Sequence, residues 1–311
     1  METTKILWRK KELVYGEDAT PTAAANAALT RNFTTKPVVT DRIQRNLDRA
    51  VRGRAPDAPS NERQTFSYEL ELAGSGAAGT AAPWMEDLEA CGMAAPVLTA
   101  ETDAVQKFAA IGTALSSMTA YHWHGTMRRR AVGARGTFGW DVTAGQYPFV
   151  KLDMTGMLLL PTPIDSVAPA APDLSRWQDP VEVNTDNTDF TLDGFALVLK
   201  SFTGDVNAEI AARNLVGARY IQRGNHAITG RIVGEVPDLG AKNYFDTLRS
   251  GAEIAVNLTH GTVAGNIVEF AGAHLQITDI DLSEENDVLM LTLSYGLNVG
   301  TTPDDLIITA K

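Results

Sequence analysis

Alternating apolar and polar residues mark the clearest strand of the chain, from Thr65 to Leu72. The even positions are Phe, Tyr, Leu and Leu, whereas the odd positions are Thr, Ser, Glu and Glu. Successive side chains of a strand point to opposite faces, so this pattern predicts one buried face and one face in water. A related, less regular pattern runs from Thr229 to Val236.

A β-hairpin pattern occurs twice, over residues 133–158 and over residues 272–297. Each copy has two alternating runs joined by a polar turn, at 144–146 in the first copy and at 283–286 in the second. Equivalent positions lie 139 apart, from the glycine that opens each copy to the leucine that ends it. Alternating runs on either side of a turn predict antiparallel strands.

Other elements recur in the same order. A short helix is predicted over residues 84–90, with Pro83 before it and Gly92 after it, and a counterpart is predicted over residues 244–251. Trp84, Leu88 and Cys91 should share the buried face of the first helix. The tripeptide Arg-Asn-Leu occurs at 45–47 and at 213–215, 168 positions apart. The spacing then shrinks toward 139, which predicts insertions in the first copy between its helix and its last hairpin.

A proline-rich stretch separates the two copies. Five prolines lie between residues 161 and 180, a composition typical of a linker. We predict a mainly β fold with two tandem antiparallel β-sandwich or barrel domains, each with one short flanking helix. The first domain is residues 1–165, the linker is residues 166–180, and the second domain is residues 181–311.

Composition narrows the class of protein. The 311 residues are 44% hydrophobic and 21% charged, as expected of a globular chain with a sizeable core, and the net charge of −11 disfavours binding to phosphate. Cys91 is the single cysteine, so no intrachain disulfide can form. Neither a membrane-spanning apolar run nor the apolar segment of a signal peptide is found, which predicts a protein made and used in a cytoplasm or released by lysis.

Candidate catalytic and metal-binding patterns are weak. His122 and His124 point the same way on a predicted strand, but no third ligand has a suitable spacing. The glycines at 74, 76 and 79 match a dinucleotide-binding fingerprint, yet the strand before them is amphipathic and the expected acidic residue is missing. The acidic cluster at 279–287 lacks the order of a calcium-binding loop, so we interpret it as a solvated hairpin tip. We expect no enzymatic activity, no metal and no cofactor.

Two basic segments are candidates for protein contacts. The arginines at 128–130 are expected to pair with an acidic neighbouring subunit. The stretch from Arg49 to Arg63 is predicted to be a long exposed loop, because it is polar and contains glycine and two prolines. Loops of this length in compact domains usually have an interaction or functional role.

Four segments carry a resemblance to a known family. They are residues 20–27 (TPTAAANA), residues 69–76 (ELELAGSG), residues 79–84 (GTAAPW) and residues 133–136 (GARG). Together they resemble the major tail tube proteins of long, flexible-tailed bacteriophages. The resemblance covers the first half of the chain, and the second half is matched through the repeat.

This resemblance implies an antiparallel β-sandwich whose strands join those of neighbouring subunits in a barrel around a central channel. Most members form hexameric rings that stack into a tube, so a duplicated chain is expected to form trimeric rings with pseudo-sixfold symmetry. The implied partners are other copies of the chain, the tape-measure protein, terminator and tip proteins, and double-stranded DNA passing through the lumen, without membrane insertion. The implied location is the virion tail, assembled in the cytoplasm of the host bacterium.

The solvated strand faces are therefore candidates for an acidic lumen wall, which would repel DNA phosphate. The lumen candidates are Thr65, Ser67, Glu69, Glu71, Lys151, Asp153, Thr155, Thr229, Arg231, Glu235, Thr292 and Ser294. The candidates for contacts between subunits or rings are Arg49, Arg52, Arg54, Asp57 and Arg63. An ordinary outward polar face is the alternative interpretation of the first set.

Two other functions stay open. One is another ring component of a tail, such as a terminator or a baseplate hub. The other is a carbohydrate-binding β-sandwich in a receptor-binding tail protein, which would need exposed aromatic side chains on a concave face. Trp84 and Trp140 are predicted to be buried, which leaves Trp8, Trp123 and Trp177 for such a face.

Overall fold

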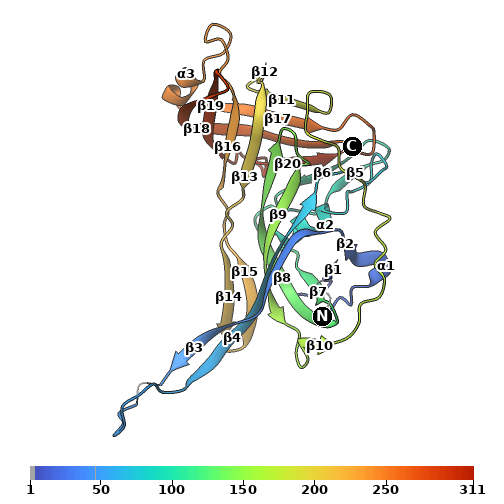
Figure 1. Ribbon diagram of the computed structural model, residues 1–311, viewed down its shortest axis with the longest axis vertical. Helices are drawn as coiled ribbons and strands as arrows, with labels where there is room; N and C mark the ends of the chain where they lie inside the picture. The colour runs from blue at the N-terminus through green and yellow to red at the C-terminus, as the bar shows by residue number, and fades with distance from the viewer. Residues whose placement is uncertain (1–3, 46) are drawn as a thin grey trace.

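The computed structural model describes residues 4–45 and 47–311 and is mainly antiparallel β, as predicted (Figure 1). Its strands are β1 (Lys5–Lys11), β2 (Ala27–Ala28), β3 (Arg31–Gln44), β4 (Asp57–Glu71), β5 (Val97–Thr99), β6 (Asp103–Lys107), β7 (Met118–His124), β8 (Met127–Thr143), β9 (Phe149–Leu158), β10 (Ile164–Ser166), β11 (Thr188–Leu192), β12 (Phe195–Ala196), β13 (Leu199–Asp205), β14 (Ile210–Leu215), β15 (Ala218–Arg223), β16 (Ile228–Glu235), β17 (Glu253–His260), β18 (Val268–Glu285), β19 (Val288–Leu297) and β20 (Ile307–Ala310). Its helices are α1 (Ala23–Asn26), α2 (Met85–Ala90) and α3 (Tyr244–Ser250).

The central feature is one continuous sheet of eight strands, which we call the inner sheet. Its order is β3–β4–β9–β8–β13–β16–β19–β18, and every neighbouring pair is antiparallel. The first four strands precede the proline-rich stretch and the last four follow it. They are joined by β8 and β13, whose register runs from Gly139↔Asp205 to Thr143↔Ser201.

The longest strands, β8 and β18, each belong to two sheets. The first part of β8 pairs with β7 and β10, and the first part of β18 pairs with β17 and β20. In β8 the change of sheet coincides with a register shift between Val132 and Arg135, where Gly133 has a φ of +60°. A β-carbon at Gly133 would lie 2.7 Å from Met157 Cε, so the crossing needs glycine.

The main apolar core lies between the inner sheet and these outer strands, and a second, small cluster contains Trp8, Ala27, Tyr121 and Trp123. The main core includes Phe66 and Leu152 of the first half and Ile232 and Leu293 of the second half, all at most 3% exposed. The expected buried face of α2 is confirmed, because Trp84, Leu88 and Cys91 are buried. Burial also raises the pKa of the Cys91 thiol, so it is an unreactive core side chain.

A buried ionic cluster links β1 to the helix α2. Arg9 Nη2 lies 2.6 Å from Asp87 Oδ2, and the hydroxyl of Tyr68 donates to Asp87 Oδ1 at 2.7 Å. The guanidinium of Arg9 also donates to the carbonyl of Pro83 and lies over the ring of Trp177. Three elements and the proline-rich stretch therefore meet at one carboxylate.

The repeated hairpin is present, with one correction to its predicted alignment. Leu152 on β9 and Leu291 on β19 lie 139 apart, as expected, but their partners are Phe138 and Leu282, which lie 144 apart. The reason is the turn: seven residues separate the last paired positions Asp141 and Phe149, whereas two separate Glu285 and Val288. A constant offset is therefore wrong for the strand before the turn.

Three further features differ from the expected elements. The stretch from Arg49 to Arg63 is a loop as far as Pro56, but residues 57–63 belong to β4. The proline-rich stretch contains β10, and residues 167–187 have no helix or strand. The insertion expected in the first half includes β5 and β6, and β6 pairs with β20 at the far end of the chain. The division into two domains stays a prediction.

Candidate functional site

One face of the inner sheet is mainly polar, with Phe149, Val233 and Met290 among its few apolar residues, and we call it the polar face. The partners on adjacent strands place Ser67 beside Asp153, and Thr292 beside Asp281, on this face. All twelve lumen candidates lie on it and none is buried. Whether the polar face lines a channel stays a prediction.

The polar face also contains carboxylates that were not among the lumen candidates, including two from the acidic cluster at 279–287, which lie within β18 and not at a hairpin tip. Asp141 and Asp205 lie next to the β8–β13 join, and Asp279 and Asp281 lie on β18. Strand alternation could have indicated the first pair, but the sheet order needed to place them together is not readable from one sequence. Among the described residues, no basic side chain forms an ion pair with any of these four.

Cations on the polar face neutralise part of this charge. Arg31 lies 2.8 Å from Glu69 and 3.7 Å from Glu71, and Lys151 lies 3.3 Å from Asp153. These pairs are partly exposed and therefore weak. The unpaired carboxylates of β8, β13 and β18 leave the face acidic overall.

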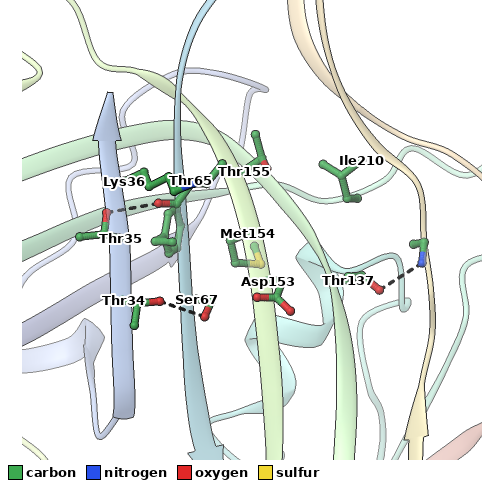
Figure 2. A pocket seen from close by; sticks show the side chains of 12 residues that line it. Thr34, Thr35, Lys36, Thr65, Ser67, Thr137, Asp153, Met154, Thr155 and Ile210 are labelled. Carbon is green, nitrogen blue, oxygen red and sulfur yellow. Dashed lines mark hydrogen bonds between the residues drawn. The ribbon is translucent and has the colours of Figure 1, made fainter. Parts of the chain in front are cut away.

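A groove with a volume of about 590 Å³ lies on the first half of the polar face, and Figure 2 shows the side chains that line it. Thr34 and Ser67 lie 3.2 Å apart, and Thr35 donates to the carbonyl of Thr65. At the other side of the groove, the N–H of Ala208 donates to Thr137 Oγ1. The lining is mostly small hydroxyl and aliphatic side chains, which suits a smooth wall better than a catalytic pocket.

The first of two long hairpins extends from the strands β3 and β4, and we call residues 41–57 the first arm (Figure 1). Arg49 and Arg52 are exposed at its tip, and Arg54 lies 2.8 Å from Asp57. Arg63 lies at the base of this arm, 2.9 Å from Asp41. Hydrogen bonds from Asn61 and Arg63 lower the pKa of Asp41, which keeps it ionised.

The second hairpin, β14–β15, was not predicted, and we call residues 210–223 the second arm. It extends from β13 and β16 as the first arm extends from β3 and β4, and it lies against the first half of its own chain (Figure 1). Its sequence lacks a regular alternation of apolar and polar residues. Its two strands are defined by their pairing with each other, from Ile210↔Arg223 to Leu215↔Ala218.

The residues of the weak chemical motifs have structural roles that need no ligand. His122 is buried and packs against Phe33 and Phe66. The glycine-rich loop packs on the second half, where the Gly76 N–H donates to the Gly265 carbonyl at 2.8 Å. Within residues 4–45 and 47–311, no cluster of three histidine, cysteine or acidic side chains could hold a metal ion.

The arginines at 128–130 do not need a neighbouring subunit. Arg128 lies 2.6 Å from Asp165 of the same chain, and Arg130 lies 3.7 Å from it. β10 brings this acidic residue alongside β8, and the expected pairing with another subunit stays a prediction.

The tryptophans do not form an exposed aromatic surface. Trp84 and Trp140 are buried, as predicted, and so are Trp8 and Trp123. Trp177 is half-buried and donates to the carbonyl of Ala27. This arrangement disfavours the carbohydrate-binding alternative. In the described part of the chain, no helix has the length and apolar character needed to cross a bilayer.

Comparisons with known proteins give one clear result. A family model described as phage tail tube protein matches residues 4–297, which is nearly the whole chain and includes both halves. A comparison with curated protein sequences gives no match.

Proposed function

Because this chain belongs to the phage tail tube protein family, we propose that three copies of it form a ring and that stacked rings form the tube of a phage tail. The observation that carries this proposal is the continuous inner sheet, in which two similar four-strand units are already joined by β8 and β13. The family is a structural one, and the tube would be a virion component assembled in the host cytoplasm.

The free edges of the inner sheet support closure into a ring. Within the described chain, β3 and the last part of β18 each have a strand neighbour on one side. Leu282 and Leu289 of the β18–β19 hairpin are 51% and 44% exposed, whereas the matching Phe138 of β8 is 1% exposed. Pairing β18 with β3 of the next copy would repeat the β8–β13 join and would remove both edges.

The polar face supports the role of conduit. In a closed ring it would face the axis, because the core and the helices α2 and α3 occupy the other side of the sheet. An acidic wall without deep pockets would let DNA pass without holding it. The tape-measure protein, the terminator and the tip proteins would be the remaining partners.

Electron microscopy of the purified protein tests the ring. We expect class averages with six similar lobes around an open channel, and a ring mass of about 100 kDa, three times the 33.4 kDa chain. Compact monomers at every concentration, without tubes even after tail-tip complexes are added, would contradict the proposal.

Gold labelling in the same images tests the lumen. A maleimide-gold label on Thr292→Cys should appear on the tube axis, whereas a label on Asp246→Cys, on the exposed side of α3, should appear outside. Cys91 is buried and should not react. Gold from Thr292→Cys on the outer surface would overturn the lumen assignment.

A further inference from the structure

We propose that the first arm of one copy docks on the second half of the next copy in the ring, as the second arm docks on the first half of its own chain. This inference rests on the proposed ring. The partner surface of the first arm would then be formed by the start of β16 and by the part of β18 around Asp279 in a neighbouring chain.

The two arms are equivalent in origin and length. They begin at equivalent pairs of the inner sheet, Thr35↔Phe66 and Phe202↔Ile232. Thirty residues separate the members of the first pair, and twenty-nine separate those of the second. The spacing of Val39 and Ile43 recurs as Val206 and Ile210, and the Arg-Asn-Leu tripeptide occurs in both arms.

The second arm shows what a docked arm contacts. The N–H of Ile221 donates to the hydroxyl of Tyr15 at 2.6 Å, and Arg135 Nη1 donates to the carbonyl of Ile221 at 3.1 Å. The arm also contacts β4, where Arg219 donates to the carbonyl of Glu62. Ile221 is 1% exposed as a result.

Among the described residues, the first arm has no such partner within its own chain. Ile43, Leu47 and Val51 are 55%, 52% and 78% exposed. Residues 47–56 have no strand pairing, whereas the second arm is paired up to a two-residue turn at Val216 and Gly217. Three exposed aliphatic side chains on one projecting hairpin indicate a surface that is covered in the assembly.

The repeat identifies the surface that would cover it. The second arm touches Arg135 on β8, which pairs with Thr155; the matching pair in the second half is Asp279 and Ser294. The position of Glu62 corresponds to the start of β16, near Ile228. The first arm of a neighbour should therefore meet Asp279 and Ile228, where the second arm meets Arg135 and Glu62.

The charges of the two surfaces are complementary. Residues 41–57 contain five arginines and three aspartates, whereas residues 279–287 contain five carboxylates and no basic residue. Asp279 and Asp281 are exposed and have no ion-pair partner among the described residues. Arg52 and Arg54 lie in the part of the first arm that corresponds to the contact around Ile221. A neighbouring arm would bring opposite charges together at this point.

A charge swap tests the contact. The variant R52D/R54D and the variant D279R/D281R should each form rings about tenfold less readily than the wild type, because like charges would then meet. A chain with all four substitutions should recover ring formation. Asp186→Arg, an exposed change outside both surfaces, is the matched control and should assemble normally. Circular dichroism and thermal unfolding of each monomer show that the variants fold.

The outcomes separate this inference from the proposed function. A wild-type protein that forms no ring contradicts the ring itself. Rings from the wild type together with normal assembly of R52D/R54D, or no recovery in the four-substituted chain, overturn the docking. Variants that form rings but no longer stack would place the arm between rings and would also overturn it.

Hydrogen exchange gives a readout that is independent of the variants. Amides of residues 47–56 should exchange rapidly in the monomer and should be protected in isolated rings. Equally rapid exchange in monomer and ring would contradict docking within the ring.

Discussion

At the scale of single residues, His122 is the most unusual titrating group of the core. Its Nε2 lies 3.0 Å from the amide nitrogen of Gln64, and its Nδ1 has no partner among the described residues. Burial, followed by the charges of Arg129 and His124, lowers its pKa from 6.5 to about 3. The imidazole therefore stays neutral in the folded protein at pH values where it is protonated in the unfolded chain.

This shift predicts a loss of stability in acid. Because the folded pKa lies below the unfolded value, the unfolded state binds more protons, and the free energy of unfolding should fall as the pH falls from 6.5 toward 3. His122→Gln should reduce this slope in urea unfolding measured at several pH values. An unchanged slope in His122→Gln would show that His122 is not the source.

At the scale of elements, the β8–β13 join depends on a close approach of backbone to ring. A β-carbon at Gly204 would lie 2.2 Å from Trp140 Cζ2, and Trp140 pairs with Gly204 across the join. The glycine lets the indole of the first half lie directly on the strand of the second half. The same ring packs against Phe202 and Phe270, so the core is continuous across the join.

Gly204→Val should therefore destabilise the protein by at least about 1–3 kcal/mol, the usual cost of overpacking a core. Chemical unfolding of purified protein measures this change. Gly296→Ala serves as the control, because the nearest atom to a β-carbon there is 3.6 Å away. If both variants were equally stable, the close approach at Trp140 would not limit the join.

The elements that could be predicted from sequence are those with a regular local pattern. The alternation from Thr65 in β4 and the Pro83 and Gly92 that flank α2 are local signals, and the alternating part of β4 and the helix α2 were found where expected. The predicted alignment of the two hairpins was wrong at β8, because the alternating pattern of a strand does not indicate the length of the turn that follows it. The second arm and the β6–β20 pairing were missed because they depend on partners far away in the sequence.

The same difference between local patterns and distant partners applies to the candidate site. Strand alternation placed all twelve predicted side chains on the polar face, since a strand fixes the side of each residue. It did not indicate that β8 and β13 join the two halves, so Asp141 and Asp205 were missed. Side chains on one strand can be grouped from the sequence, whereas grouping across strands needs the order of the sheet.

At the scale of the whole molecule, two strand pairings connect the halves, β8 with β13 and β6 with β20. We therefore expect the chain to unfold in one cooperative transition. All five tryptophans lie at or before residue 177, so their fluorescence reports the first half and, through Trp140, its join to the second half, whereas far-ultraviolet circular dichroism reports both halves in full. The two urea curves should coincide. Separate midpoints would show that the halves unfold independently.

The β8–β13 join also bears on how assembly would depend on concentration. If the proposed ring is correct, three of its six sheet junctions form within single chains during folding, and dilution cannot prevent them. Only three junctions between chains remain, and three chains meet instead of six, so the rate of ring formation should have a lower reaction order than for six separate subunits. A phage would then need a smaller pool of free subunit before the first ring closes on its initiator.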